Sequence, residues 1–214
     1  MFDLQDTVPD ALRRHEIPID DAAKARVLGW ALEAQKHGQK TNLIGTMDAR
    51  RIAAELVADS LMVLRVLDEA PSRIVDIGAG AGVPGLILCA ALDVDGLLIE
   101  PRLKRTMFLR HCARTLGLGT KVRAHEARIE ALPEETFAWS GPQLWVSRAV
   151  FAPAQWLRVA AEHASAGDWI ALWHNGHLDF DAVDFPTDTL VALKKITYSI
   201  AGPGDRTIFV FERL

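Results

Sequence analysis

Apolar and polar residues follow two different patterns along the chain, and the change comes near residue 70. Before it, apolar residues recur about every three to five positions, the spacing of a helix with one buried face. One predicted helix starts after the N-cap residue Asp20 and ends near Gly38, and a second covers residues 48–68. We therefore expect an N-terminal helical extension over residues 1–70. The apolar face of its first helix would comprise Ala23, Val27, Trp30, Leu32 and Ala34.

After Pro71, short apolar runs that fit strands alternate with helical segments. Strands joined in this way build a parallel sheet with helices on both faces. The last two runs, 191–199 and 207–212, are joined by turn residues and predict an antiparallel hairpin that completes the sheet. We therefore expect an α/β fold with a Rossmann-like, doubly wound sheet over residues 71–214. The other predicted strands cover 73–77, 96–100, 121–125, 143–147 and 168–173, and the predicted helices start near Pro84 or cover 102–116 and 153–163.

Composition restricts the partners and the compartment. The chain has 214 residues and a net charge of −4, so a nucleic acid would have to be bound by a local basic patch. Its apolar stretches are too short for a membrane span, and its N-terminus lacks the profile of a signal peptide. Two cysteines make no disulfide framework, which favours the reducing cytoplasm.

Three alternating glycines follow the first predicted strand. Asp76-x-Gly78-x-Gly80-x-Gly82 places residues without side chains at the carboxyl edge of the sheet, where ligands of open α/β sheets bind. Glu100 ends the next strand, where its carboxylate can accept hydrogen bonds from both hydroxyls of a ribose. The pattern predicts a site for a cofactor that contains adenosine.

Two other interpretations of this glycine turn stay open. The glycines could simply turn the chain, with a solvated acid at the end of the next strand. Gly80, Gly82 and Gly85 also satisfy the G-x-G-x-x-G pattern of dinucleotide sites, with an acid fifteen residues further on. Asp76 before the turn, Pro84 within it and the terminal hairpin favour S-adenosylmethionine, whose amino-acid end Asp76 would meet through water or backbone.

Six motifs in a fixed order carry a resemblance to a known family: Thr41-Asn42-Leu43, Ala58-Asp59-Ser60-Leu61, Ile74 to Gly85, Leu98 to Arg110, Ala127-Arg-Ile-Glu130 and Val146-Ser-Arg-Ala149. In these residues the chain resembles the glucose-inhibited division protein B family, the ribosomal small-subunit RNA (guanine-N7) methyltransferase G, as a divergent member. The resemblance covers the chain from about Asp20 to its end. It implies a class I S-adenosylmethionine-dependent methyltransferase domain over residues 71–214.

The resemblance further implies that the substrate is N7 of a guanosine in 16S ribosomal RNA. The partner would be that RNA or a small ribosomal subunit assembly intermediate. Independently of the resemblance, we expect a cytoplasmic monomer that does not bind membranes. Because N7 already carries a free lone pair, the reaction needs positioning of the two reactants and no general base. We therefore assign no catalytic proton-transfer residue.

The same resemblance assigns roles to individual residues around the cofactor. Gly78 and Val83 would line its methionine and adenosine parts, and Glu100 would bind its ribose. Arg148 would reach from the fourth strand to the cofactor carboxylate or the substrate, although a structural salt bridge is the alternative. Together with the glycine turn, the expected cofactor-binding residues are Asp76, Gly78, Gly80, Gly82, Val83, Glu100, Ile129, Glu130 and Arg148, of which Ile129 and Glu130 would border the adenine.

A one-signed run of basic residues follows Glu100 and is the predicted RNA-binding surface. RNA recognition needs cations for phosphates, and this run lies beside the expected cofactor site. A solvated helix face is the alternative interpretation. The expected RNA-binding residues are Arg102, Lys104, Arg105 and Arg110 of this run, together with Arg128, which matches a family arginine near the site.

The chain also departs from the family pattern on the expected RNA side. His37-Gly38 stands where a Trp-Asn pair is usual, Ile44 replaces a threonine, and Glu55-Leu56 replaces an Arg-His pair. These changes leave open a different methyl acceptor, such as a small molecule or a protein, or a non-catalytic S-adenosylmethionine-binding protein. Trp173 ends a strand at the functional edge and could stack on a base. We expect no metal site, because His174, His177, Asp179 and Asp181 form only a loose cluster.

Overall fold

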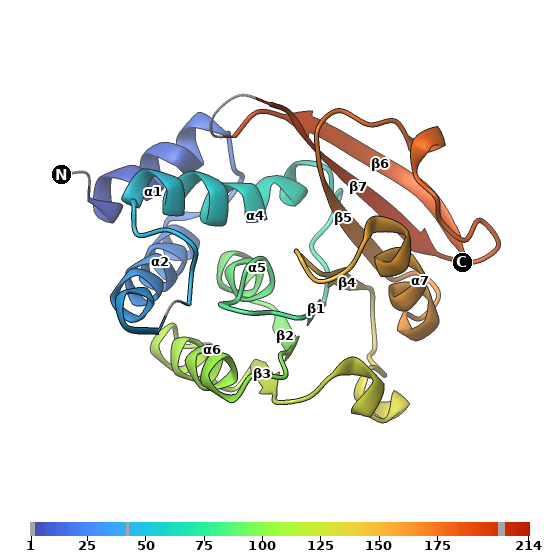
Figure 1. The fold of residues 1–214 in the computed structure, drawn as a ribbon, viewed down its shortest axis with the longest axis horizontal. Helices are drawn as coiled ribbons and strands as arrows, with labels where there is room; N and C mark the ends of the chain where they lie inside the picture. Colours follow the sequence, from blue (N-terminus) through green and yellow to red (C-terminus); the bar gives the residue numbers. More distant parts are fainter. Residues whose placement is uncertain (1–2, 42, 201–203) are drawn as a thin grey trace.

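A seven-stranded sheet with the order β3-β2-β1-β4-β5-β7-β6 forms the centre of the computed structural model, which describes residues 3–41, 43–200 and 204–214 (Figure 1). The first five strands are parallel, and β7 runs antiparallel between β5 and β6. This arrangement confirms the α/β fold with a terminal hairpin. The strands are β1 (Arg73–Ile77), β2 (Asp95–Ile99), β3 (Val122–His125), β4 (Gln143–Val146), β5 (Trp169–Asn175), β6 (Leu190–Tyr198) and β7 (Arg206–Arg213).

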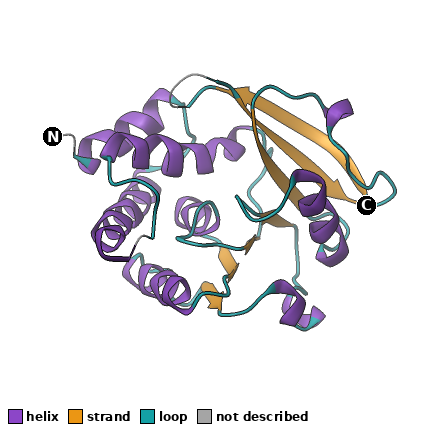
Figure 2. Ribbon diagram, in the orientation of Figure 1, coloured by secondary structure: helices purple, strands orange, loops and turns teal. Residues whose placement is uncertain are grey.

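The central strands β1 and β4 are buried throughout because helices cover the sheet on both faces (Figure 2). All five residues of β1 are buried, and β1 pairs with β2 on one side and β4 on the other. The carboxyl ends of these three strands therefore lie side by side at one edge of the sheet. The main helices are α1 (Leu4–Arg14), α2 (Asp21–Thr41), α5 (Gly85–Leu92), α6 (Leu103–Thr115) and α7 (Pro153–His163).

One helical segment with changing winding connects α2 to β1. It consists of α3 (Ala49–Arg51), a π-helical stretch (Ile52–Ala58), α4 (Asp59–Leu61) and a 3-10 turn (Met62–Arg65). The segment confirms the second predicted helix, and the side chain of Asp48 caps its start by accepting from the Arg51 amide at 2.9 Å. The wide winding ends at Ala58, and the following Asp59 is fully buried.

The N-terminal helices pack on the same face of the sheet as α5 and α6, and one hydrophobic cluster joins them. Trp30 of α2 is fully buried, and its indole N–H donates to the carbonyl of Ala81 at 2.9 Å. The helical extension thus contacts the glycine turn directly. A second cluster on the opposite face contains α7. The division of the chain into residues 1–70 and 71–214 stays a prediction.

The start of α2 is confirmed, whereas its predicted end and one of its face residues are wrong. The Asp20 side chain accepts from the Ala23 amide at 2.7 Å, as an N-cap does. The helix continues to Thr41 rather than ending near Gly38, and Leu32 is exposed while its neighbour Ala31 is buried. The predicted motif residue Asn42 and the side chain of Thr41 lie outside the described residues. Within the described part of the chain, no helix is long and apolar enough to cross a membrane.

Candidate functional site

The glycine turn follows β1 directly and lies beside the end of β2. Its three alternating glycines have φ angles of +77° at Gly78, +56° at Gly80 and +91° at Gly82. Residues with a Cβ rarely adopt this left-handed conformation, so the turn requires glycine at these positions. The amides of Gly78 and Ala79 donate to the carbonyl of Ile99, which holds the turn against the end of β2.

The Glu100 carboxylate connects the glycine turn to the start of α6. Its Oε2 accepts from the Gly80 amide and its Oε1 accepts from the Arg102 amide, each at 3.0 Å. The side chain of Arg105 lies 3.9 Å from Oε2. A carboxylate has about four acceptor positions, so both oxygens keep capacity for further donors such as ribose hydroxyls. This geometry fits the ribose of an adenosine cofactor.

Asp76 is fully buried beneath the turn. Its Oδ2 accepts from the Gly85 amide at 2.8 Å, at the first residue of α5, and its Oδ1 is buried without a hydrogen-bond partner. Burial raises the pKa of the Asp76 carboxyl to about 7, because the charged form is desolvated and the Glu100 charge adds to this effect. The contact of Asp76 with the amino-acid end of the cofactor, through water or backbone, stays a prediction.

Arg148 follows β4 and forms the salt bridge that the sequence leaves open as an alternative. Its Nη2 lies 2.5 Å from Oδ2 of the fully buried Asp59 and donates to the Glu55 carbonyl at 3.1 Å. Asp59 also accepts from Tyr198 at 2.6 Å and from Arg206. Arg148 Nη1 is buried without a partner, so one nitrogen of the guanidinium is left for a ligand.

Sequence reasoning missed two residues that shape this site. Asp59 belongs to the motif Ala58-Asp59-Ser60-Leu61, but the sequence assigned it no function. Its partners are too distant in the sequence to be recognised from a local pattern. Val150 covers Gly78, since a Cβ added to Gly78 would lie 2.3 Å from Val150 Cγ2. The preceding Ala149 has a φ of +60°, a strained value that marks the loop after β4 as closely fitted to the turn.

The residues predicted to border an adenine follow β3. Ile129 starts a 3-10 turn (Ile129–Ala131) and is buried in the same hydrophobic cluster as Ile99, whereas Arg128 and Glu130 are exposed. Val83 lies half-buried after the glycines. These positions ring the carboxyl edge of the sheet, but their contacts with a cofactor stay predictions.

The predicted RNA-binding cations are divided by their contacts into two groups. Arg102 and Lys104 are exposed at the start of α6. Arg105 is half-buried against Glu100, and Arg110 donates through Nε and Nη2 to the Ala124 carbonyl at 3.0 and 2.9 Å. The first two are therefore the cations most available to a polyanion, while the last two also hold α6 against the sheet.

The stacking role of Trp173 stays a prediction, and the structure gives this residue contacts inside the protein. Its side chain is half-buried and packs against the main hydrophobic cluster, and its indole N–H donates to the Asp59 carbonyl at 3.2 Å. Near it, His177 and Asp179 lie 3.9 Å apart and Asp179 is paired with Lys195. Among the described residues, the loop after β5 contributes no cluster that could hold a metal ion.

Comparison with known proteins places this site in a family. The family model for GidB, described as rRNA small subunit methyltransferase G, matches residues 25–180. The chain is 40% identical over 152 residues to ribosomal RNA small subunit methyltransferase G of Desulfotalea psychrophila, covering 70% of this chain and 68% of the relative. The protein of the same name from Wolinella succinogenes is 40% identical over 140 residues, covering 65% and 68%.

The fold is also that of solved methyltransferase structures. TrmN from Thermus thermophilus superimposes with a TM-score of 0.53 at 20% identity, over 72% of this chain and 48% of that one. This likeness supports the fold alone, whereas the family match extends over the glycine turn, Glu100 and Arg148. The expected class I, S-adenosylmethionine-dependent methyltransferase is thereby confirmed, and the chain belongs to the GidB family of rRNA small subunit methyltransferases G.

Proposed function

We propose that this chain transfers the methyl group of S-adenosylmethionine to N7 of a guanosine in 16S ribosomal RNA. The observation that carries the proposal is the Glu100 carboxylate. It is anchored by the Gly80 and Arg102 amides and keeps acceptor capacity at the edge where three parallel strands end. Family membership supports the RNA substrate, because relatives that are 40% identical are named as ribosomal RNA methyltransferases.

Several of the predicted cofactor residues then have a specific task. Glu100 accepts from the ribose hydroxyls, and the exposed backbone of the glycine turn lets the donor approach closely. The unpartnered Nη1 of Arg148 donates to the donor carboxylate, and the unpartnered Oδ1 of Asp76 meets its ammonium through water. The full set is Asp76, Gly78, Gly80, Gly82, Val83, Glu100, Ile129, Glu130 and Arg148.

The reaction requires orientation rather than proton transfer. When bound, S-adenosylmethionine supplies a methyl group on a positively charged sulfur. Guanine N7 is already nucleophilic, so the protein has to hold the base in line with that methyl group and exclude water. The glycine turn and the loop that carries Val150 lie next to each other and are suited to fix these two reactants.

The RNA would lie across the start of α6, beside the donor edge. Arg102 and Lys104 would contact phosphates there, and Arg105, Arg110 and Arg128 would extend the same basic surface. We further propose that residues 1–70 act as an extension of the methyltransferase domain 71–214. The RNA is bound either free or within a small-subunit assembly intermediate, by a monomer in the cytoplasm.

The acceptor is tested with 16S ribosomal RNA and 30S particles from cells that lack the protein, incubated with the purified chain and radiolabelled donor. We expect label in the RNA. Chemical cleavage of the RNA strand at N7-methylguanosine should then occur at one position where no cleavage occurs before the reaction. Labelling of a protein or a small molecule when an extract of the same cells is incubated in this way, with no label in RNA, would refute the RNA assignment. Binding of NADH without binding of S-adenosylmethionine would refute the donor as well.

The donor site is tested by Glu100→Gln. The amide removes the charge and one acceptor, and hydrogen bonds to charged groups are worth about 1.5–3 kcal/mol, so we expect donor affinity to fall about tenfold to 100-fold. Isothermal titration calorimetry measures the affinity, with the exposed Glu162→Gln on α7 as the matched control. Equal affinities in the two variants would place the donor elsewhere.

A further inference from the structure

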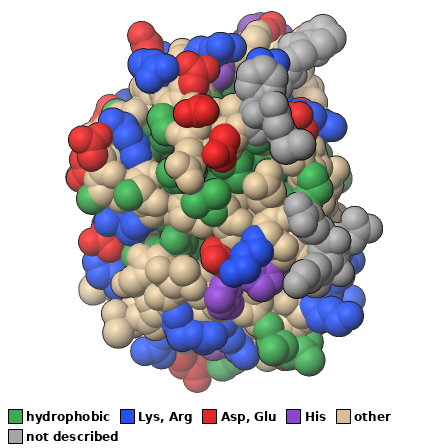
Figure 3. Space-filling view, turned by 90° about the vertical axis from the view of Figure 1, so that its left-hand side faces the viewer, with side chains coloured by type: hydrophobic (Ala, Val, Ile, Leu, Met, Phe, Trp, Pro, Cys, Tyr) green, Lys and Arg blue, Asp and Glu red, His purple; other side chains and the backbone are tan. Residues whose placement is uncertain are grey.

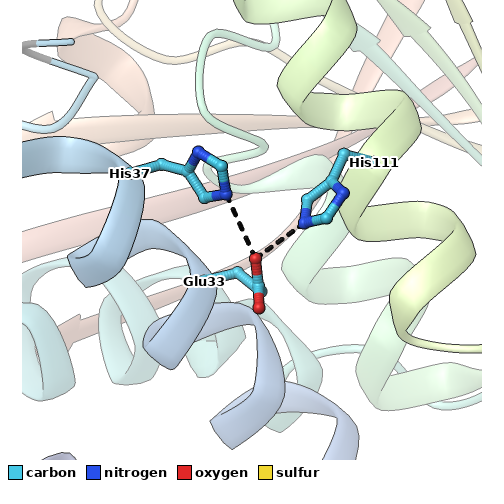
Figure 4. A group of neighbouring side chains, drawn as sticks. All are labelled: Glu33, His37 and His111. Carbon is cyan, nitrogen blue, oxygen red and sulfur yellow. Dashed lines mark hydrogen bonds and ion pairs between the residues drawn. The ribbon is translucent and has the colours of Figure 1, made fainter. Parts of the chain in front are cut away.

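Two histidines and a glutamate meet between α2 and α6, outside the site described above (Figure 4). Glu33 and His37 are four residues apart on α2, so they share one face of the helix, and His111 faces them from α6. Their side chains point toward a common centre from two elements that are far apart in the sequence.

The distances between the three side chains suit a single small cation. Glu33 Oε2 lies 3.3 Å from His37 Nε2 and 2.7 Å from His111 Nε2, and all three atoms lie within 4.8 Å of one another. Zinc binds histidine nitrogen and carboxylate oxygen at about 2.0–2.2 Å, so neighbouring ligands of a tetrahedral ion are about 3.4 Å apart. Side-chain movements of about an ångström would bring both imidazoles to this spacing.

The two imidazole rings are held in position by packing. The His37 ring lies edge-on to buried Phe108 with centroids 5.5 Å apart, and the two histidine rings are 5.1 Å apart. The Glu33 side chain is 17% exposed, whereas those of His37 and His111 are 38% and 41% exposed. The group is therefore preformed yet open to solvent on one side, which leaves room for water as a fourth ligand.

The surrounding charge limits how tightly a cation binds. Lys36 lies 3.8 Å from the other Glu33 oxygen, and Lys104, Arg105 and Arg114 line the same hollow as the two histidines. Figure 3 looks onto this side of the molecule and shows histidines gathered beside acidic and basic side chains. The ligand set must overcome this repulsion, which favours ions that imidazole binds strongly over Mg²⁺ or Ca²⁺.

We infer that Glu33, His37 and His111 form a binding site for a divalent transition-metal ion of the zinc type. The ion joins α2 of the helical extension to α6. The start of α6 is fixed next to the donor edge, where Thr106 donates to the Glu100 carbonyl at 2.8 Å. Metal binding thus ties the N-terminal helices to the helix that follows Glu100. The inference does not rest on the proposed RNA substrate, although Lys104 and Arg105 of the proposed RNA-binding surface line the same hollow.

The test titrates the full-length chain, freed of any affinity tag, with Zn²⁺ in a calorimeter and with Co²⁺ in a spectrophotometer. We expect one ion per chain, a visible ligand-field absorption from bound Co²⁺, and a rise in the melting temperature with Zn²⁺. Because Co²⁺ reports coordination in the unmodified protein, the absence of this absorption and of saturable Zn²⁺ binding would overturn the proposal without any variant.

Single variants assign the ligands. Glu33→Gln, His37→Gln and His111→Gln should each weaken Zn²⁺ binding by more than about tenfold and reduce the rise in melting temperature. The matched control is His163→Gln, because His163 also packs against an aromatic ring, Phe137 at 5.1 Å, but lies on α7. Circular dichroism checks that each variant is folded. Binding that is unchanged in folded His111→Gln, or equally abolished in the control, would refute the site.

Discussion

Arg148 and Asp59 are joined by a salt bridge of 2.5 Å between the loop after β4 and the start of α4. Asp59 is fully buried and also binds Tyr198 and Arg206 of the terminal hairpin. One carboxylate therefore connects the helical extension, the loop beside the glycine turn and the last two strands. Burying an ion pair is costly, but removing one partner leaves the other charge uncompensated in the interior.

Asp59→Asn should lower the free energy of unfolding by about 3–5 kcal/mol, the usual cost of breaking a buried ion pair. The substitution keeps the shape and leaves two guanidinium groups without a counter-charge. Urea denaturation measures the change. Arg148→Met in the same background removes one of the unpaired charges, so the double variant should be less destabilised than the sum of the two single variants. Strict additivity would show that the pair is energetically uncoupled.

This network also shows where sequence-based prediction reached its limit. The strands and the glycine turn follow local patterns, so β1, β4 and the hairpin were predicted to within one or two residues. Asp59 and Arg206 are 147 positions apart, and no local pattern connects them. The position of Val150 over Gly78 depends likewise on how a loop folds back on the sheet.

Two features of the helical region were missed for a similar physical reason. The gap of five residues between Leu56 and Leu61 fits the wider winding of the observed π-helical stretch, but apolar spacing alone does not separate this winding from an α-helix. The Glu33 and His111 pair was missed because each residue is an ordinary polar residue on its own helix. Only the packing of α2 against α6 brings them together.

Gly78→Ala should destabilise the protein through two separate effects. The left-handed φ of +77° costs about 1–3 kcal/mol for a residue with a Cβ, and that Cβ would lie 2.3 Å from Val150 Cγ2. We expect weaker donor binding and a lower free energy of unfolding, measured by calorimetry and urea denaturation.

A matched control separates these two effects. Gly167 has a φ of +86° with no atom within 4 Å of an added Cβ, so Gly167→Ala carries only the conformational cost. The double variant Gly78→Ala, Val150→Ala should regain the free energy of unfolding by which Gly78→Ala falls below Gly167→Ala. If Gly78→Ala lowers the free energy of unfolding by no more than Gly167→Ala does, the loop after β4 is not in close contact with the turn.

Asp76 should make stability depend on pH. Its pKa is about 7 in the folded protein and 3.8 when unperturbed, so the folded chain binds this proton more tightly. The protonated Asp76 carboxyl contributes fully to the free energy of unfolding below about pH 4, and this contribution is lost as the pH rises toward 7. Since one pKa unit corresponds to about 1.4 kcal/mol, the loss is on the order of 4 kcal/mol.

The measurement compares urea denaturation of the wild type and Asp76→Asn from pH 4 to pH 8. Asparagine keeps the acceptor for the Gly85 amide and cannot ionise, so the other titrating groups cancel in the difference. The wild type should lose stability relative to the variant as the pH rises. A difference that is constant over this range would mean that the Asp76 carboxyl titrates normally.

The last prediction concerns the exposed cations at the start of α6. Arg102→Ala combined with Lys104→Ala should weaken binding of 16S ribosomal RNA and make log K less dependent on log salt concentration, by about 0.7–0.9 for each phosphate that the protein no longer neutralises. Arg105 is kept, because its guanidinium lies 3.9 Å from Glu100 and its removal would also change the donor site. Filter binding at several salt concentrations gives the slope.

The control removes a cation from the other face of the sheet. Arg158 on α7 pairs with Asp184 at 2.8 Å, so Arg158→Ala should leave both the affinity and the slope unchanged. Donor affinity should be the same in all three proteins, which separates weakened RNA binding from a disturbed cofactor site. If the double variant keeps the wild-type slope, α6 presents a solvated face and the RNA is bound elsewhere on the molecule.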